Sequence, residues 1–418
     1  MLMAFANALI LFYGMAKVLY LTYDGMTDPL GQAQIWPYLS CLRDRGHSIT
    51  IVSFEKQVGE ERLTAQRAQL QSAGIRWKSF PYHKRPAIFS TLWDLWRMRQ
   101  GASRILREEK FDIVHARSYL PAMVGLVLRR VHKIKLVFDA RGFWIDERIE
   151  GKIWNPRNPI FKLVIGYLRQ WEQRLFASAD HVVLLTEQAK KLVTAGRPAL
   201  AQPDRVTVIP CCVDVSLFRP SSGEPLRQKW FDRLNIAPAR QVILYHGSWG
   251  TWYLTREVMR LMRIAKLENQ NFILLVATPQ PAALVLADAQ AEGVATEDVR
   301  VVSVGHRDIP ELLSVARLAV FFIAPVFSKQ ASSPTKLGEI VACGVPLITN
   351  TGVGDNDRLL RQESAAALVD DFSPESLKRA VRKMTSIDVP QFSGELVGFF
   401  ALGKGVDSYD KIYKELTS

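Results

Sequence analysis

The sequence predicts two doubly wound α/β domains of the Rossmann type, and three observations support that prediction. Short apolar, β-branched runs alternate with helical patterns along almost the whole chain, which is typical of parallel sheets with crossover helices. The chain has 418 residues, which is more than a single hydrophobic core of ordinary size accommodates. Hydrophobic residues make up 48% and charged residues 23% of the chain, as in globular proteins with large buried cores.

The expected strands fall into two series. Those of the first series cover residues 18–23, 48–54, 75–82, 112–117, 135–141, 181–186 and 206–210. Those of the second cover residues 242–248, 272–278, 299–304, 318–325, 345–349 and 366–370. Between the two series, residues 210–225 are rich in Pro, Ser and Gly, which predicts a domain boundary. We therefore expect one domain over residues 15–212 and a second over residues 213–392.

The two ends of the chain differ from these domains. Residues 1–14 are apolar, lack a basic stretch and a cleavage site, and form too short a run to span a bilayer. We expect a non-native or dispensable extension with Met15 as the natural start; a short membrane-surface anchor is the alternative. Residues 393–418 predict a final helix that is too small to form its own core and must dock on a domain already formed.

Charge is distributed unevenly along the chain. The net charge is +13, and residues 1–190 hold 28 Lys and Arg against 17 Asp and Glu, whereas the remainder is nearly balanced. A basic excess in one half favours an anionic partner there, whether nucleic acid, an anionic membrane surface or a phosphorylated substrate. A merely solubilising charge is the alternative. The four Cys and seven His are scattered without the spacing of zinc or redox motifs, so we expect no metal site and no resident cofactor.

In open parallel sheets, ligands bind beyond the carboxyl ends of the strands, so the loops there are the candidate sites. The first such loop spans residues 24–32 and contains Gly25 and Gly31. These glycines would permit tight turns, and a helix starting near Gly31 would direct its free amides at an anion. A loop that merely turns would look the same.

A second loop, beginning at Asp139, contains three carboxylates, two guanidiniums and two aromatic rings within ten residues. Charges at this density need partners. In the functional interpretation Arg141 binds an anion or a hydroxyl, Asp139 accepts hydrogen bonds from sugar hydroxyls, and His115 and Arg117 face the same site. A structural ion-pair network is the alternative for the loop, and a core histidine is the alternative for His115.

The second domain offers two further loops. Residues 245–252 include Gly247 and Ser248, small residues that permit a close backbone approach. In residues 333–349, Ser333 and Pro334 predict the N-cap and first residue of a helix that ends at Gly344.

That helix carries two charged candidates. Lys336 is a point charge suited to a diphosphate, and Glu339, one turn further on, can accept two hydroxyl hydrogen bonds such as a ribose diol offers. An ordinary exposed helix glutamate is the alternative for Glu339.

The segment 333–349 resembles the donor-site helix of retaining glycosyltransferases of family 4, which have the GT-B fold. VIPCCVDVSLFRP at 208–220 is similar to the family's interdomain element, and the segment starting YLTYDG at residue 20 is similar to its N-terminal glycine loop and first β-α-β unit. ELLSVARLAVFFIAP at 311–325 resembles the stretch before the donor helix. The resemblance extends over nearly the whole chain from about Lys17.

Three positions depart from the family pattern. The first glutamate of the family's E-x7-E motif would fall on Ala331, which leaves the contact to the transferred sugar to Ser332 or Ser333. Asp139 stands where many members have a catalytic-site histidine. The basic pair that usually follows the first strand of the second domain is not evident near Gly247, so Arg256 or Lys336 would meet the diphosphate.

The resemblance implies metal-independent, retaining transfer from a UDP- or GDP-linked sugar, with the final helix crossing back to the N-terminal domain. The expected catalytic residues are Asp139, Arg141 and Lys336. The expected donor-binding residues are Gly31, Gly247, Ser248, Arg256, Ser333, Thr335, Lys336 and Glu339. The expected acceptor-binding residues are Asp24, His115, Arg117 and Trp144.

The basic N-terminal half is expected to meet the acceptor. Arg129, Arg130, Lys133, Lys135 and the stretch 152–174 would hold the protein on the inner face of the cytoplasmic membrane, where each Lys or Arg contributes roughly 1 kcal/mol. We expect a lipid-linked glycan acceptor in surface polysaccharide biosynthesis. A nucleotide-sugar 2-epimerase on the same fold is the first alternative; a nucleic-acid-binding protein is the second, although no binding motif or interleaved aromatic platform supports it.

Overall fold

The computed structural model describes residues 15–196, 200–221, 223–387 and 391–418. The chain forms two compact units, of which the first comprises Met1–Pro210 with Leu402–Ser418 and the second Cys211–Ala401. The sequence predicted these two domain boundaries at residues 212 and 392. The predicted extension 1–14 lies outside the described residues.

The first unit is built on a seven-stranded parallel sheet of order β3-β2-β1-β4-β5-β6-β7. Its strands are β1 (Lys17–Thr22), β2 (Ser48–Glu55), β3 (Arg76–Pro81), β4 (Ile113–Arg117), β5 (Lys135–Asp139), β6 (His181–Leu184) and β7 (Val206–Val208). The order reverses beside β1, so the carboxyl ends of β1, β4 and β5 meet at the point where such sheets bind ligands.

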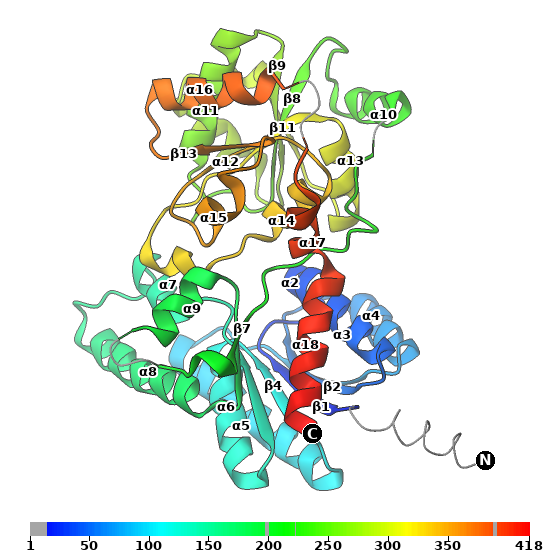
Figure 1. Cartoon of the computed structure of the whole chain (residues 1–418), viewed down its shortest axis with the longest axis vertical. Helices are drawn as coiled ribbons and strands as arrows, with labels where there is room; N and C mark the ends of the chain where they lie inside the picture. The colour runs from blue at the N-terminus through cyan, green and yellow to red at the C-terminus, as the bar shows by residue number, and fades with distance from the viewer. Residues whose placement is uncertain (1–14, 197–199, 222, 388–390) are drawn as a thin grey trace. The chain divides into compact units, whose positions relative to one another are not determined.

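The helices of the first unit form two layers (Figure 1). From β1 to β3 the chain adds strands towards one edge of the sheet, and from β3 to β6 it adds them towards the other edge. Because the crossovers are right-handed, the helices of these two parts lie on opposite faces of the sheet. One layer holds α3 (Trp36–Asp44) and α4 (Glu60–Ser72), and α18 (Leu402–Thr417) packs on α3. In the other, α5 (Ala87–Glu108) packs on α6 (Tyr119–His132), which packs on α8 (Pro159–Ser178). The remaining helices are α2 (Pro29–Gln34), α7 (Trp144–Glu150), α9 (Glu187–Thr194) and the 3-10 turn η1 (Pro203–Arg205).

The second unit has a six-stranded sheet of order β10-β9-β8-β11-β12-β13. Its strands are β8 (Gln241–His246), β9 (Phe272–Ala277), β10 (Val299–Val302), β11 (Ala316–Val320), β12 (Leu347–Asn350) and β13 (Ala366–Val369). Its helices are α10 (Glu224–Leu234), α11 (Thr255–Glu268), α12 (Ala282–Ala291), α13 (Ile309–Ser314), α14 (Thr335–Ala342), α15 (Asn356–Leu360), α16 (Pro374–Thr385) and α17 (Gly394–Phe400), with 3-10 turns η2 (Thr296–Asp298), η3 (His306–Asp308) and η4 (Phe327–Ala331).

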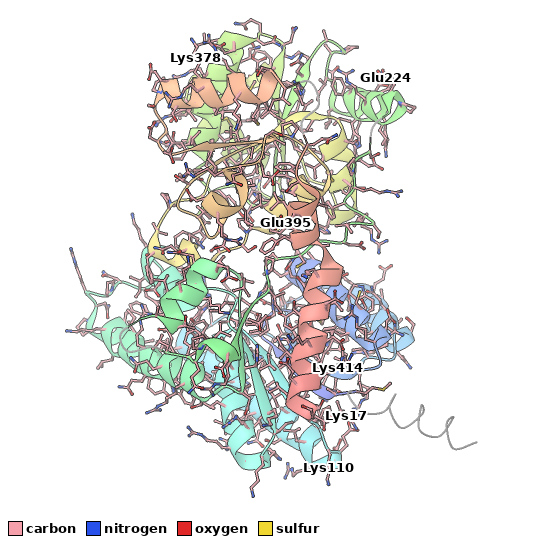
Figure 2. All side chains as sticks on the ribbon, in the orientation of Figure 1. Lys17, Lys110, Glu224, Lys378, Glu395 and Lys414 are labelled. Carbon is pink, nitrogen blue, oxygen red and sulfur yellow. The ribbon has the colours of Figure 1, made fainter. Side chains whose placement is uncertain are left out.

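Both predicted strand series are present, and the central strands are apolar runs buried from both faces by helices, whereas β3 at the edge of the first sheet is partly exposed. Every residue of β9, FILLVA, is buried, as expected for a central parallel strand. Charged side chains such as Lys110, Glu224 and Lys378 are instead exposed at the surface (Figure 2). None of the helices in the described part of the chain is both long and apolar enough to cross a bilayer.

The predicted strand 318–325 is wrong in its second half, because β11 ends at Val320. Beyond that point the side chain of Asn350 takes over the backbone pairing. It accepts from the amide of Ile323 and donates to the carbonyl of the same residue, both at 2.9 Å. The segment thus leaves the sheet early and leads into η4.

Candidate active site

In the second unit, a buried lysine lies among aromatic rings near the end of β8. Lys336, in the first turn of α14, places Nζ 4.3 Å from the ring centroid of Tyr245 and 3.8 Å from that of Tyr253. Nζ has no hydrogen-bond partner among the residues that the structure describes. Burial lowers the pKa of Lys336 to about 7, although Glu339 opposes that shift. The cation is therefore desolvated without a matching anion, a costly arrangement that an anionic ligand would relieve.

The loop after β8 approaches this lysine closely. Gly247 has φ of +103°, and a Cβ added there would lie 3.0 Å from Nζ of Lys336. Both the backbone conformation and the space therefore require glycine. Next to it, the carbonyl of Ser248 accepts a hydrogen bond from the hydroxyl of Tyr245, which holds one of the rings that contact Lys336.

Glu339, one turn along α14, is buried between two histidines. His246 Nε2 lies 2.8 Å from Oε2, and His306 Nε2 lies 2.7 Å from Oε1. Burial raises the pKa of Glu339, but these hydrogen bonds outweigh it and bring the pKa to about 2. An ionised carboxylate only accepts hydrogen bonds, so Nε2 of each imidazole donates. Burial lowers the pKa of His246, with Glu339 opposing.

In the first unit, a pocket opens at the carboxyl ends of β4 and β5. It is lined by Tyr20, Gln34, Tyr38, Leu39, Leu42, His115, Asp139, Arg141 and Tyr409. Asp139 ends β5 and is paired in register with Arg117, the last residue of β4. Neighbouring strand ends thus deliver Asp139, His115 and Arg117 to one place.

The charge of Asp139 is held by two arginines and a histidine. Nε2 of His115 and NH1 of Arg117 lie 3.7 and 3.8 Å from its Oδ2, and NH1 of Arg141 lies 3.8 Å from its Oδ1. Burial raises the pKa of Asp139, but Arg141, His115 and Arg117 together lower it below its ordinary value. Among the described residues, neither Oδ1 of Asp139 nor Nε2 of His115 has a hydrogen-bond partner. Two buried polar atoms that can form further hydrogen bonds thus lie in the lining of one pocket.

The backbone beyond β5 is strained in a way that positions Arg141. Its φ is +60°, a left-handed conformation uncommon for a residue with a side chain, and Gly142 follows at +132°. This turn brings Arg141 back over the pocket, where NH2 donates to Oε1 of Gln34 at 3.3 Å. Strain of this kind concentrates at functional sites.

Two family models match the chain, one for each unit. The glycosyl transferase 4-like domain matches residues 32–212, and the model named glycosyl transferases group 1 matches residues 240–386. The chain belongs to the group 1 glycosyltransferases.

Known proteins similar to this glycosyltransferase share its fold at low sequence identity. A D-inositol 3-phosphate glycosyltransferase from Segniliparus rotundus is 23% identical over 284 residues, which are 64% of this chain and 56% of that relative's length. The chain thus spans little more than half of that relative. A glycosyltransferase structure from Rickettsia africae has a TM-score of 0.70 at 16% identity and covers 97% of this chain and 99% of its own. The Anabaena protein HepE, in complex with UDP and glucose, has a TM-score of 0.67 at 15% identity, with 95% and 99% coverage.

Several residues expected at the donor site of the glycosyltransferase are placed differently. Ser333 is not the N-cap of α14, because Pro334 takes that position. The Ser333 hydroxyl instead accepts from the amide of Cys211 at 3.2 Å. Thr335 is the first residue of α14 and directly precedes Lys336. Arg256 lies on α11 with an exposed side chain, and its ion-pair partner is Asp288 at 3.8 Å, not the Lys336 cluster.

Of the acceptor candidates, Asp24 lies beside the pocket and Trp144 lies outside it. Nε of Arg117 is 3.3 Å from Oδ2 of Asp24, which joins Asp24 to the charged cluster. Trp144 instead stacks on Tyr119 with ring centroids 6.0 Å apart, and it is not among the pocket-lining residues.

In the C-terminal part of the loop that begins at Asp139, the charged residues form the structural ion-pair network given as the alternative. Arg169 pairs there with both Asp146 and Glu172. These charges stabilise the contact of α7 with α8 and lie outside the pocket lining.

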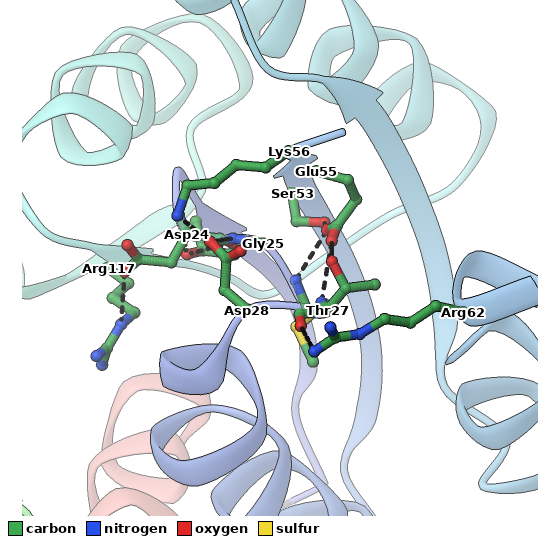
Figure 3. Close-up of polar contacts among 11 residues, drawn as sticks. Asp24, Gly25, Thr27, Asp28, Ser53, Glu55, Lys56, Arg62 and Arg117 are labelled. Carbon is green, nitrogen blue, oxygen red and sulfur yellow. Dashed lines mark hydrogen bonds and ion pairs between the residues drawn. The ribbon is translucent and has the colours of Figure 1, made fainter. Parts of the chain in front are cut away.

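The glycine loop of the glycosyltransferase directs its amides at Glu55, at the end of β2, and at Asp28 of the loop itself (Figure 3). Glu55 accepts from the amides of Met26 and Thr27 at 2.8 and 3.0 Å, and Asp28 accepts from the amide of Gly25 at 3.3 Å. Glu55 also accepts from the hydroxyls of Thr27 and Ser53.

A tight turn is present at Gly25, whose carbonyl accepts from the amide of Asp28 at 3.1 Å, whereas the turn predicted at Gly31 is wrong because Gly31 lies within α2. The helix expected to start near Gly31 is α2, which begins two residues earlier at Pro29. A Cβ on Gly31 would lie 2.1 Å from the carbonyl oxygen of Gly25, so glycine is needed there for close packing. A donor contact at Gly31 stays a prediction.

His246, His306 and Tyr409 were missed in the sequence. His246 ends β8, and that position at the carboxyl end of a strand was the one available signal. Among the described residues, no group of three or more His, Cys, Asp or Glu side chains has an arrangement that could hold a metal ion.

Proposed function

We propose that this glycosyltransferase moves a sugar from a UDP- or GDP-linked donor to a lipid-linked glycan acceptor in surface polysaccharide biosynthesis. Transfer proceeds with retention and without a metal, at the inner face of the cytoplasmic membrane. The observation that carries the proposal is the buried, unpartnered ammonium of Lys336 beside Gly247.

A nucleoside diphosphate fits the chemistry of the second unit. Its diphosphate would supply the anion that Lys336 lacks, and the first turn of α14 adds the positive end of a helix dipole. The Glu339 carboxylate accepts one hydrogen bond on each oxygen, which leaves lone pairs for the hydroxyls of a ribose. The UDP bound to the Anabaena protein supports uracil as the base.

In the proposed reaction the bond between the anomeric carbon and the diphosphate oxygen breaks, and a bond to the acceptor oxygen forms on the same face. The departing phosphate oxygen takes the acceptor's proton. Lys336 and the α14 N-terminus stabilise the charge that develops on the diphosphate. Catalysis rests on this stabilisation and on positioning, and it needs no protein nucleophile.

The pocket of the first unit supports an acceptor rich in hydroxyl groups. Oδ1 of Asp139 can accept from a sugar hydroxyl, and Arg141 can donate to a hydroxyl or a phosphate oxygen. The acceptor's lipid-linked form is inferred from the basic excess of the N-terminal half.

Thermal shift measurements with UDP-, GDP- and dTDP-sugars test the donor site. Wild-type protein should be stabilised by one nucleotide class, and Lys336→Met and Glu339→Gln should abolish that shift. Lys378→Met, an exposed lysine of the same unit, should behave as wild type. The absence of any nucleotide-dependent shift in the wild type would contradict the proposal. Release of free nucleoside diphosphate only with acceptor present separates transfer from 2-epimerisation.

A further inference from the structure

One helix of the first unit exposes a row of large hydrophobic side chains. On α5, Phe89 is 73% exposed, and Ile88, Leu92, Trp93 and Trp96 are each 44% exposed or more. Positions 89, 92, 93 and 96 repeat at helical spacing, so they lie along one side of the helix. The rings of Trp93 and Trp96 stack with centroids 4.9 Å apart.

A second helix of the same layer repeats the pattern. On α8, Leu163 is 77% exposed, and Ile160 and Tyr167 are 63% and 54% exposed. The helices α5 and α8 both pack on α6, so all three lie on one face of the sheet (Figure 1). The outer side of this layer thus carries exposed hydrophobic side chains on two separate helices. Scattered single residues of this kind are ordinary, whereas grouped ones mark an interaction site.

The exposed charged residues around these side chains are mostly basic. Exposed cations flank α5 at Lys84, Arg85, Arg99, Arg104 and Arg107, and flank α8 at Lys152, Arg157, Lys162 and Arg174. Among the described residues of 84–108 and 152–174, the acids are Asp94 and Glu172, which are buried, and Glu108, the last residue of α5, which is exposed. We call this surface, with the hydrophobic side chains of α5 and α8, the basic apolar face.

The cluster expected at residues 129–135 is less free to meet lipid. Nε and NH2 of Arg129 donate to Asp180 at 2.6 and 3.0 Å, and Lys135 lies 3.9 Å from the same carboxylate. Asp180 therefore partly neutralises that cluster. On the basic apolar face, the exposed acid among the described residues of 84–108 and 152–174 is Glu108, at the end of α5.

We propose that the basic apolar face docks on an anionic bilayer. Stacked Trp rings and Tyr167 combine an apolar body with a polar tip, which suits the level of the lipid headgroups. Phe89, Leu92 and Leu163 enter the acyl boundary, and the surrounding Lys and Arg contact anionic headgroups. A nucleic acid would match the charge but not the exposed aliphatic side chains. The inference rests on the proposed function only in that a lipid-linked acceptor would be met at this surface.

Vesicle binding tests the inference without donor or acceptor. Full-length protein should cosediment with vesicles of phosphatidylcholine and phosphatidylglycerol, and much less with phosphatidylcholine alone. The variant Phe89→Ser/Trp93→Ser/Trp96→Ser should weaken binding by at least about tenfold. Leu267→Ser/Leu284→Ser is the matched control, because it removes exposed hydrophobic side chains from the second unit.

Fluorescence locates the contact independently. Brominated lipid should quench wild-type emission, and Trp93→Phe/Trp96→Phe should lose most of that quenching while still binding vesicles. Equal binding to both vesicle types, or wild-type binding by the triple variant, would overturn the inference. A dimer that the triple variant disperses, without vesicle binding, would overturn it in favour of a second copy of this chain. If the membrane inference is overturned but the donor-dependent thermal shifts persist, the proposed donor site remains supported.

Discussion

The hydroxyl of Tyr409 donates a hydrogen bond to Oδ2 of Asp139 across 3.2 Å, linking the last helix of the chain to the end of β5. One turn further on, the hydroxyl of Tyr413 lies 2.6 Å from Nδ1 of His115. The helix α18 therefore supplies hydrogen bonds to the buried acid and the buried imidazole of the first unit. The C-terminal segment is part of this pocket and not only a packing element.

Removing the Tyr409 hydroxyl should damage acceptor use selectively. Tyr409→Phe removes one hydrogen bond from the buried carboxylate of Asp139, so we expect the free energy of unfolding to fall by about 1 kcal/mol. We expect a roughly tenfold lower kcat/KM for the acceptor. The nucleotide-dependent thermal shift should be unchanged. Tyr82→Phe, which alters a tyrosine outside the pocket lining, is the control. A lost nucleotide shift in Tyr409→Phe would contradict this assignment.

Alanine substitutions at two glycines of the loop after β8 can distinguish backbone strain from contact with Lys336. Gly247 and Gly250 have φ of +103° and +92°, so alanine should destabilise either position by roughly 1 kcal/mol. Only at Gly247 would the new Cβ contact Nζ of Lys336, since nothing lies within 4 Å of a Cβ at Gly250.

Gly247→Ala should therefore weaken nucleotide binding about tenfold in a calorimetric titration, whereas Gly250→Ala should bind normally. Equal affinities for the two variants would show that the loop does not approach the ligand at Gly247.

Nucleotide binding should be coupled to protonation of Lys336. At pH 8, above its pKa of about 7, the free side chain is mostly neutral, and a bound diphosphate favours the ammonium form. We expect an uptake approaching one proton for each nucleotide bound at pH 8, and much less at pH 6. Titration calorimetry in buffers of different ionisation enthalpy measures this number, and Lys336→Met should remove it. The same uptake in Lys336→Met would assign the proton to another group.

The same pKa shift has a consequence for stability. The pKa of Lys336 is about 7 in the folded protein, whereas a lysine of the unfolded chain has the ordinary value of 10.5. Between these two pH values the unfolded chain therefore binds more protons than the folded protein. Lys336 should therefore make the unliganded protein more stable as the pH rises from 7 to 10.5. Lys336→Met should flatten this part of the stability profile, as denaturant unfolding at several pH values would show.

Glu339 should contribute stability that acid removes. Its folded pKa of about 2 lies below the ordinary 4.5, so the contribution is complete above pH 4.5 and is lost as the pH falls towards 2. In Glu339→Gln the amide oxygen can accept, but its NH2 group faces a second donating imidazole. The stability gap between wild type and variant should be on the order of 3 kcal/mol at pH 6 and should narrow below pH 4.5. A gap that does not change with pH would contradict the ionised state.

The predicted proximity of His115, Arg117 and Asp139 followed from topology. Carboxyl ends of neighbouring parallel strands share one edge, and the register pairs Arg117 with Asp139. The position of the donor helix was also predictable, because Gly344 follows α14 with φ of +68°. The cap was predicted one residue too early, because Ser333 and Pro334 make a similar pattern in either register.

The sequence by itself determined the two parallel sheets, the family and the loops in which charged residues gather. These features depend on local apolar periodicity and on the order of motifs, both of which are written along the chain. Only the tertiary structure decided that His246 and His306 converge on Glu339, that Lys336 is buried among aromatic rings, and that Tyr409 reaches Asp139. These partners, including Tyr245 and Tyr253 around Lys336, are separated by between 33 and 270 residues along the chain. Burial and pairing at such separations depend on how the folded elements pack, and that packing sets the pKa values on which the proposed chemistry rests.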